Sequence, residues 1–263
     1  MARHVAHALL ALALALEWLV LPGTWLAVAW PLTLLGFVAI VGWLVVSPRT
    51  QVFVPTVYRA PAPAAGVAFT FDDGPDPKWT PRVLEILAAH EAKATFFVVG
   101  ERALAHPELV ARIAREGHEI ACHGHTHAFG FHFWSARRMA RDIARGQEAL
   151  VTLLGRASPW FRPPQGIRVP HLHSALDRLP VRPRCVTWSA RGLDSRPTTA
   201  PRIEARLAPA VRAGSILTLH DGTGFGGGTD RAPTLVALGS LLSTARARGL
   251  RCVGLSDLFG ASP

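Results

Sequence analysis

The chain has 263 residues, of which 49% are hydrophobic and 17% are charged, which is enough for one large core. Its formal net charge of +10 comes almost entirely from arginine, because only Lys78 and Lys93 are lysines. The arginines are scattered, without interleaved aromatic residues or a nucleic-acid motif, so we expect no nucleic-acid partner and favour an anionic membrane surface.

The apolar excess lies at the N-terminus. A first apolar stretch covers residues 8–21, ends at Pro22-Gly23, and is followed by a second stretch over residues 24–46. The second stretch has 23 residues, enough to span about 30 Å of hydrocarbon, whereas the first is marginal. We therefore predict that residues 1–47 form a membrane anchor with one or two transmembrane helices.

Two arrangements of this anchor remain open. In a hairpin both stretches cross and the chain returns to its starting side, whereas in the other arrangement residues 24–46 cross alone. Flanking basic residues prefer the cytoplasmic side, and a hairpin places Arg3, Arg49 and Arg59 there together. Glu17 counts against the hairpin, because a carboxylate within the membrane is costly. We favour the hairpin, and with it an anchor in the inner membrane and a domain on its cytoplasmic face.

A signal peptide and a buried helix pair both fit the apolar region less well than a membrane anchor. A cleaved signal peptide would need a small-residue cleavage site before a polar mature start, and none is present. A buried pair of helices in a soluble protein would show one polar face, but the apolar character continues on every face.

Residues 48–65 contain four prolines and are predicted to be a Pro-rich linker, because proline disfavours helix and limits strand pairing. Over residues 66–263 strand-like runs alternate with helical patterns, which indicates an α/β fold with a mainly parallel sheet. The predicted strands are Gly66–Phe71, Ala94–Val99, Glu119–Cys122, Trp160–Arg162, Cys185–Ser189, Ser215–Leu219 and Arg251–Leu255. The predicted helices are Thr80–His90, Pro107–Glu116, Ser135–Leu154, Ala200–Ala213 and Thr234–Arg248. Seven or eight such units can close into a barrel, whose chemistry gathers at the carboxyl ends of its strands.

Two polar clusters at predicted strand ends together indicate a metal site. Asp72 and Asp73 follow an apolar run within Thr-Phe-Asp-Asp-Gly-Pro, and His123 and His127 follow the run that ends at residue 122. The spacing of four lets both imidazoles face one ion, while alternation puts His125 on the other side. One carboxylate and two histidines suit a divalent metal, and the second carboxylate can act as a base on water. The alternatives are a simple turn and structural histidines.

Three more polar residues follow predicted strands. Arg162 beside a carboxylate base would hold it ionised, although an arginine there could also be a surface charge. Asp194 carries little information alone. His220 lies at the mouth of a buried strand and is placed to protonate a leaving group, for which a pKa near neutrality is suitable.

Taken in order, the motifs T-F-D-D-G-P, H-x-x-x-H, R-P-P-x-G, a later Asp and L-x-L-H match a family. Over residues 66–257 the chain resembles the polysaccharide deacetylases, the NodB-homology domain of carbohydrate esterase family 4. The resemblance implies a distorted (β/α) barrel of seven or eight strands. It also implies metal-dependent removal of acyl groups from amino sugars.

The resemblance also implies roles for the residues at matching positions. Asp72 would be the catalytic base and Arg162 its partner. Asp73, His123 and His127 would bind a divalent metal, Zn²⁺ or a similar ion such as Co²⁺.

On the leaving-group side, the resemblance implies that His220 is the general acid and that Asp194 tunes it. Leu217 would line the small pocket for the acyl methyl group. The backbone N–H of Gln165 would donate to the oxyanion.

The chain departs from the family pattern at the substrate subsites. Gly124 replaces a hydroxyl residue that braces the histidine loop, Gln165 replaces an aromatic residue, and Arg191 and Ser195 stand at two places in the fourth motif. These changes suit long polymers such as chitin poorly. Arg191 near the mouth would suit an anionic group, for example that of a lipid-linked sugar phosphate.

Together these features predict a membrane-anchored, metal-dependent amidase. Its substrate would be an N-acylated, for example N-acetylated, amino sugar in an envelope glycan or a lipid-linked saccharide, with membrane lipid as a second partner. The alternatives are a deacylase of a small non-sugar amide and a catalytically inactive glycan-binding module. The intact aspartates and histidines argue against the inactive module.

Overall fold

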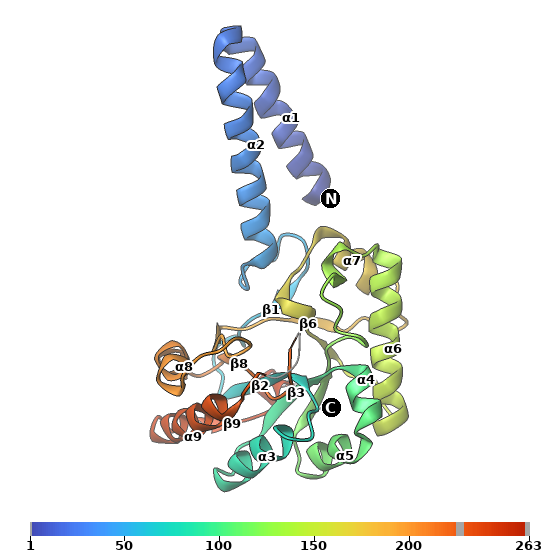
Figure 1. Ribbon diagram of the computed structural model, residues 1–263, viewed down its shortest axis with the longest axis vertical. Helices are drawn as coiled ribbons and strands as arrows, with labels where there is room; N and C mark the ends of the chain where they lie inside the picture. Colours follow the sequence, from blue (N-terminus) through green and yellow to red (C-terminus); the bar gives the residue numbers. More distant parts are fainter. Residues whose placement is uncertain (1, 225–228, 261–263) are drawn as a thin grey trace.

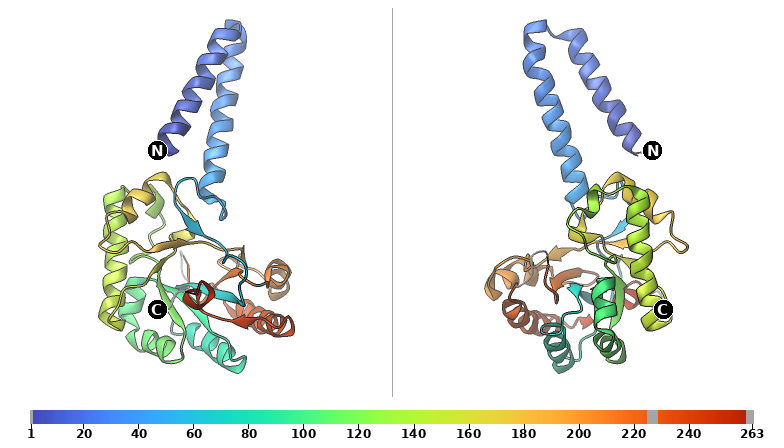
Figure 2. Two further views of the ribbon diagram at one scale, coloured as in Figure 1. Left: turned by 180° about the vertical axis from the view of Figure 1, so that it is seen from behind. Right: turned by 45° about the vertical axis from the view of Figure 1, so that its right-hand side comes forward.

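A pair of long N-terminal helices projects from an α/β domain in the computed structural model, which describes residues 2–224 and 229–260 (Figure 1). Helix α1 (Ala2–Val20) and helix α2 (Gly23–Val46) run antiparallel and are joined by a tight turn (Figure 2). The hydroxyl of Thr33 in α2 donates a hydrogen bond to the carboxylate of Glu17 in α1. The acidic side chain that counted against a hairpin is therefore partnered within it.

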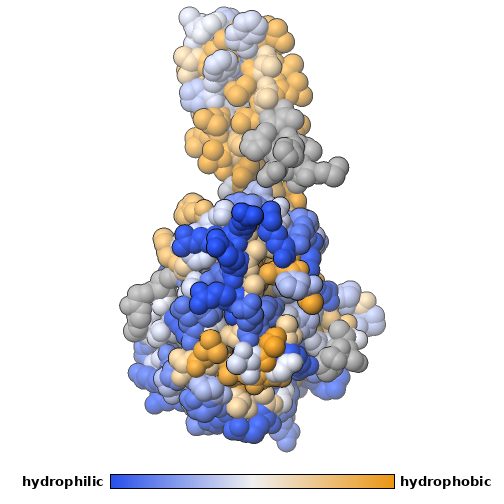
Figure 3. Space-filling view, turned by 90° about the vertical axis from the view of Figure 1, so that its right-hand side faces the viewer, coloured by the Kyte–Doolittle hydropathy of each residue, from blue (hydrophilic) through white to orange (hydrophobic). Residues whose placement is uncertain are grey.

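Helix α2 has the length and composition to cross a membrane, and it is the one such helix in the part of the chain that the structure describes. None of its residues is buried. The apolar section of α1, Leu9–Val20, is shorter. Figure 3 shows the apolar surface of this pair above a largely hydrophilic domain. The antiparallel pair has the form expected of a hairpin, while the number of membrane crossings stays a prediction.

The domain is built on a parallel sheet with the strand order β1-β6-β5-β4-β3-β2-β8-β7, and β9 pairs with β2 outside this path. The strands are β1 (Thr56–Val57), β2 (Gly66–Gly74), β3 (Ala94–Val98), β4 (Glu119–Cys122), β5 (Trp160–Phe161), β6 (Arg184–Val186), β7 (Ala190–Arg191), β8 (Ile216–His220) and β9 (Arg251–Cys252). No pairing joins β1 to β7 among the described residues, so the sheet forms a barrel that is open on one side. The predicted α/β fold, a distorted barrel of seven or eight strands, is confirmed.

Helices cover the outer face of this sheet (Figure 1). They are α3 (Thr80–Ala89), α4 (Gly100–Ala105), α5 (Pro107–Arg115), α6 (Ala136–Leu154), α7 (Pro170–Leu176), α8 (Ala200–Leu207) and α9 (Ala232–Ala247), with short 3₁₀ turns at Phe131–Phe133, Pro164–Gly166 and Ala208–Ala210. Helix α10 (Leu255–Leu258) packs against the inward-facing residues instead. The main core lies between sheet and helices and includes Phe69 and Leu217. A smaller core, with Ala68 and Ile216, fills the inside of the barrel beside α10.

The Pro-rich segment predicted as a linker over residues 48–65 contributes to the sheet. Its residues 56–57 form β1, which pairs with β6, and Arg59 bridges to Ser215. Proline confines this pairing to two residues at the edge of the sheet. The segment is therefore partly packed against the domain.

Element boundaries differ from the predictions where the runs are short. The predicted strand over residues 251–255 ends after Cys252, because helix α10 begins after Gly254. Of the run over residues 185–189, only Cys185 and Val186 lie in a strand, β6, and β7 begins after the run, at Ala190. Helices α4 and α7, with six and seven residues, are too short to show a helical period in the sequence.

The register of the two central strands, β2 and β8, brings polar side chains together at their carboxyl ends. Strands β2 and β8 pair Thr70 with Thr218 and Asp72 with His220. Because side chains alternate along a strand, these four residues share the inner face of the barrel. The aspartates and His220 thus meet at the edge where barrel chemistry is expected.

Candidate active site

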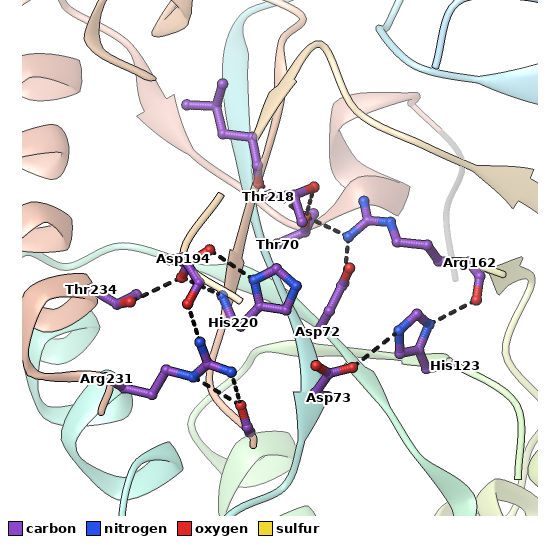
Figure 4. A network of polar contacts seen from close by, with 12 residues as sticks. Thr70, Asp72, Asp73, His123, Arg162, Asp194, Thr218, His220, Arg231 and Thr234 are labelled. Carbon is purple, nitrogen blue, oxygen red and sulfur yellow. Dashed lines mark hydrogen bonds and ion pairs between the residues drawn. The ribbon is translucent and has the colours of Figure 1, made fainter. Parts of the chain in front are cut away.

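Two consecutive aspartates end β2, and an irregularity brings both of them to the site. Along a regular strand Asp72 and Asp73 would point to opposite faces. The pairing of β2 with β3 shifts register between Asp72 and Gly74, and Asp73 has a φ of 72°, in the left-handed region. Such bulges re-aim side chains beside functional sites. Figure 4 shows Asp72 between Arg162 and His220, with Asp73 beside it and facing His123.

Asp73, His123 and His127 form a buried cluster of potential metal ligands, each offering one atom within 4.8 Å of the others. Oδ1 of Asp73 lies 3.5 Å from Nε2 of His123 and 3.1 Å from Nε2 of His127. Nδ1 of His123 lies 2.8 Å from the carbonyl oxygen of Arg162 and donates its proton there. This hydrogen bond leaves the Nε2 lone pair of His123 directed toward Asp73.

The electrostatics of the cluster fit a divalent cation. Burial of the ring, with a smaller contribution from His123, lowers the pKa of His127 to about 4, so this ring keeps a lone pair at neutral pH. Burial opposes ionisation of Asp73, but His123 and then His127, when their rings carry a proton, hold the pKa of Asp73 below its usual range. A carboxylate and two imidazole lone pairs that converge on one point repel each other unless a cation binds there. These donors suit Zn²⁺ or a similar ion.

The loop that carries the histidines is braced by a residue that the sequence analysis missed. Asp142, buried on α6, accepts hydrogen bonds from the backbone N–H of His125 at 3.0 Å and of Thr126 at 3.2 Å, and from the Thr126 hydroxyl at 2.7 Å. A Cβ at Gly124 would lie 2.8 Å from the Asp142 carboxylate. The glycine that departs from the family pattern therefore makes room for a carboxylate that braces the loop instead. His125 lies outside the ligand cluster, with Nε2 3.8 Å from Glu101.

The other carboxylate, Asp72, is held by a fully buried arginine. Nη1 of Arg162 lies 2.5 Å from Oδ1 of Asp72 and donates to the hydroxyl of Thr70 at 2.8 Å. Nη2 of Arg162 donates to the carbonyl oxygen of Thr187 at 2.9 Å. Burial lowers the pKa of Arg162, and the charge of Asp72 opposes this, as expected of a paired buried guanidinium. The pair fixes Oδ1 of Asp72 and leaves Oδ2 to accept a proton.

His220 is held from behind by Asp194. Nδ1 of His220 lies 2.8 Å from Oδ1 of Asp194, and Oδ2 of Asp194 accepts from the backbone N–H of His220 at 3.0 Å and from the Thr234 hydroxyl at 2.9 Å. Arg231 is fully buried and donates hydrogen bonds to the carbonyl oxygens of Asp194 and Gly222 (Figure 4). The sequence pattern did not indicate this residue. Burial disfavours the charged ring, but Asp194 and then the two other aspartates raise the pKa of His220 to about 9.

These pKa values predict the alkaline limb of the pH–rate profile. If His220 acts as an acid, activity is present below its pKa and falls as pH rises through about 9. Replacing Asp194 with asparagine removes the largest contribution that raises this pKa. The limb should then move by about one pH unit or more toward the ordinary histidine value. Measuring kcat against pH for both proteins checks this, and an unchanged limb would assign it to another group.

The structure brings most of the predicted site residues together but not Leu217. Leu217 is fully buried on the face of β8 that packs against the helices, so the prediction that it lines the acyl pocket is wrong. Thr218 lies on the inner face instead, because side chains alternate along the strand. Gln165 lies in the turn after β5 with a φ of 60°, and Arg191, at the end of β7, is exposed.

A parallel barrel with two carboxylates, a histidine and a set of potential metal ligands at the carboxyl ends of its strands has the arrangement of a hydrolase. The model for the family described as "Polysaccharide deacetylase" matches residues 59–183. A peptidoglycan-N-acetylglucosamine deacetylase of Bacillus cereus is 34% identical over 198 residues, which are 73% of this chain and 87% of that protein. A chitooligosaccharide deacetylase of Sinorhizobium fredii is 37% identical over 172 residues, which are 65% and 78% of the two chains.

The solved structures agree with these relatives. The crystal structure of the Bc1960 peptidoglycan N-acetylglucosamine deacetylase has a TM-score of 0.70 and 31% identity, and the match covers 79% of this chain and 94% of that one. The chain belongs to the polysaccharide deacetylase family. It is a hydrolase of carbon–nitrogen bonds other than peptide bonds.

Proposed function

We propose that this protein is a metal-dependent hydrolase that removes an N-acetyl group from an amino sugar of an envelope glycan or lipid-linked saccharide. The observation that carries the proposal is the placement of two polar pairs around the ligand cluster. The pair of Asp72 with Arg162 and the pair of His220 with Asp194 both lie beside Asp73 (Figure 4). The names of the relatives, deacetylases of peptidoglycan and of chitooligosaccharides, supply the substrate class.

The residues of the chain have separable tasks in this reaction. A Zn²⁺ ion held by Asp73, His123 and His127 would polarise the acyl carbonyl and acidify a water molecule. Asp72 accepts a proton from the attacking water through Oδ2, since Oδ1 is held by Arg162.

The leaving group departs on the other side of the site. His220, held at Nδ1 by Asp194, donates a proton from Nε2 to the sugar nitrogen as the carbon–nitrogen bond breaks. The backbone N–H of Gln165 is assigned to the oxyanion. The products are acetate and a free amino sugar.

The direct test uses the purified full-length protein with added Zn²⁺ and N-acetylated chitotetraose. Acetate and new free amine should appear in equal amounts. Hydrolysis of small N-acetyl amides without action on chitotetraose or on sugar phosphates would favour the small-amide deacylase. Binding of the oligosaccharide without turnover would favour the inactive glycan-binding module.

The domain organisation and location belong to the same proposal. Residues 1–47 anchor the protein in the inner membrane, residues 48–65 lead out of it, and residues 66–263 carry out the reaction. The antiparallel arrangement of α1 and α2 supports the hairpin, with the domain on the cytoplasmic face.

A reporter enzyme that is active only in the periplasm tests this topology. Fused to Pro263 it should be inactive, whereas fused to a chain truncated after Pro22, in the turn between the helices, it should be active. Because flanking arginines favour retention of both ends, we expect this pattern. Periplasmic activity of the Pro263 fusion would overturn the hairpin and place the substrate outside.

A further inference from the structure

The end of the membrane helix is clamped to the rim of the active site. Arg168, 2% exposed, donates through Nη1 to the carbonyl oxygen of Thr50 at 2.6 Å and through Nη2 to that of Ser47, just beyond α2. Its backbone N–H donates to Val45, in the last turn of α2, at 3.1 Å. Arg168 stands six residues after Arg162 in the loop that also carries Gln165. The domain is therefore held against the end of α2 by hydrogen bonds, rather than connected to it by a flexible linker.

A second set of contacts connects the end of α2 with Asp72. The hydroxyl of Thr187 donates to the carbonyl oxygen of Pro48 at 2.7 Å, while its own carbonyl oxygen accepts from Arg162 at 2.9 Å. Arg162 in turn contacts Asp72 at 2.5 Å. The path from the chain that leaves α2 to the proposed base therefore passes through Thr187 and the guanidinium of Arg162 only. Its length is about 15 Å by ordinary chain dimensions.

That distance is about twice the thickness of one headgroup layer of a bilayer. The polar headgroup layer on each side of the hydrocarbon is about 5–8 Å thick. With the hydrocarbon boundary near the end of α2 at Val46, the site lies at most about 10 Å beyond the outer edge of the headgroups. A sugar attached to a lipid headgroup would reach the active site from the membrane. For a polymer remote from the membrane, an active site held close to the membrane would bring no advantage.

A cationic group lies beside the same rim. The ring of Trp188, next to Thr187, stands between two guanidiniums, 5.9 Å from Cζ of Arg162 and 5.2 Å from Cζ of Arg191. Burial, and then the nearby charge of Arg196, lower the pKa of Arg191. Within the described residues, neither Arg191 nor Arg196 forms an ion pair with a carboxylate. The unpaired guanidinium of Arg191, which lies over the Trp188 ring, offers planar donors and a charge that match a phosphate.

We infer that the substrate is an N-acylated amino sugar joined through a phosphate to a membrane lipid, with Arg191 contacting the phosphate. This inference rests on the proposed deacylase activity and narrows its substrate. The contacts of Pro48 and Thr50 with the active-site loops supply the membrane proximity, and the guanidinium of Arg191 supplies the charge.

The test uses the full-length protein in phospholipid nanodiscs with Zn²⁺ and four N-acetylglucosamine probes. They are the sugar phosphate esterified to a long isoprenoid alcohol, a neutral long-chain alkyl glycoside, the soluble sugar 1-phosphate, and chitotetraose. The phosphate-linked lipid should have the highest kcat/KM, about tenfold or more above each of the others, the usual worth of a charged hydrogen bond.

The variant Arg191→Gln separates the phosphate contact from the chemistry. It should raise KM for the phosphate-linked lipid about tenfold and change KM for the neutral probes much less, so that the preference for the phosphate-linked lipid falls about tenfold. Arg246→Gln, an exposed arginine in the last turn of α9, is the matched control and should change nothing.

The possible failures are distinguishable. Deacetylation of chitotetraose or the neutral glycoside as fast as the phosphate-linked lipid would overturn the inference and leave the proposed function standing. Equal rates with the lipid-linked and soluble sugar phosphates would assign the site to a free sugar phosphate. No acetate from any probe would overturn the proposed function and this inference with it.

Discussion

Replacing Asp72 with asparagine is expected to lower kcat for deacetylation by about 10²–10⁴-fold, the usual worth of a positioned proton acceptor. The amide keeps the shape of the side chain and can still accept from Arg162, but it cannot take a proton from water. Metal content should be unchanged, because Asp73 rather than Asp72 faces His123 and His127. Steady-state acetate release and metal analysis on the same samples measure both quantities.

The control for this variant is Asp257→Asn, which removes an exposed carboxylate on α10. It should keep both activity and metal. Near-normal turnover of Asp72→Asn would show that another group is the base.

Replacing His127 with alanine is expected to lower bound metal at least about tenfold and to abolish most of the activity. The change removes one of three converging ligands, and even the loss of an outer-shell partner commonly costs 10–100-fold in metal affinity. His125→Ala, in the same loop, should keep its metal, because this ring lies outside the cluster. Plasma mass spectrometry after dialysis gives metal per protein, and circular dichroism checks that both variants are folded.

Equal metal content in His127→Ala and the unchanged protein would contradict the ligand assignment. Loss of metal from both histidine variants would instead point to a general disturbance of the loop that Asp142 braces.

Much of the site was predictable because its residues lie in short motifs at the ends of apolar runs. Asp72-Asp73 and His123-x-x-x-His127 carry their chemistry in their spacing, and alternating strands and helices bring such ends together. The bulge at Asp73 was not predictable, since nothing in the sequence shows that β2 departs from its regular period there.

The supporting residues were missed for a different reason. Asp142 lies 16 to 17 residues from the loop that it braces and Arg231 lies 37 residues from Asp194, and neither belongs to a recognisable motif. Only tertiary packing reveals such contacts. Leu217 was misassigned although a signal was available, because a residue three positions before His220 on a strand faces the other side.

The relation between anchor and domain also required the structure. The sequence predicts a linker over residues 48–65, but the contacts of Pro48 with Thr187 and of Thr50 with Arg168 join sites more than 100 residues apart. They join the end of α2, the helix with the length and composition of a membrane span, to the rim of the proposed active site.

The most direct test of the central claim follows acetate release from N-acetylated chitotetraose as metal is removed and returned. The full-length protein is assayed as purified, after dialysis against a chelator, and after addition of one equivalent of Zn²⁺. The ligand cluster at Asp73 predicts that chelation lowers the rate at least about 100-fold and that Zn²⁺ restores it. A metal-free protein that retains the full rate would contradict metal-dependent deacetylation.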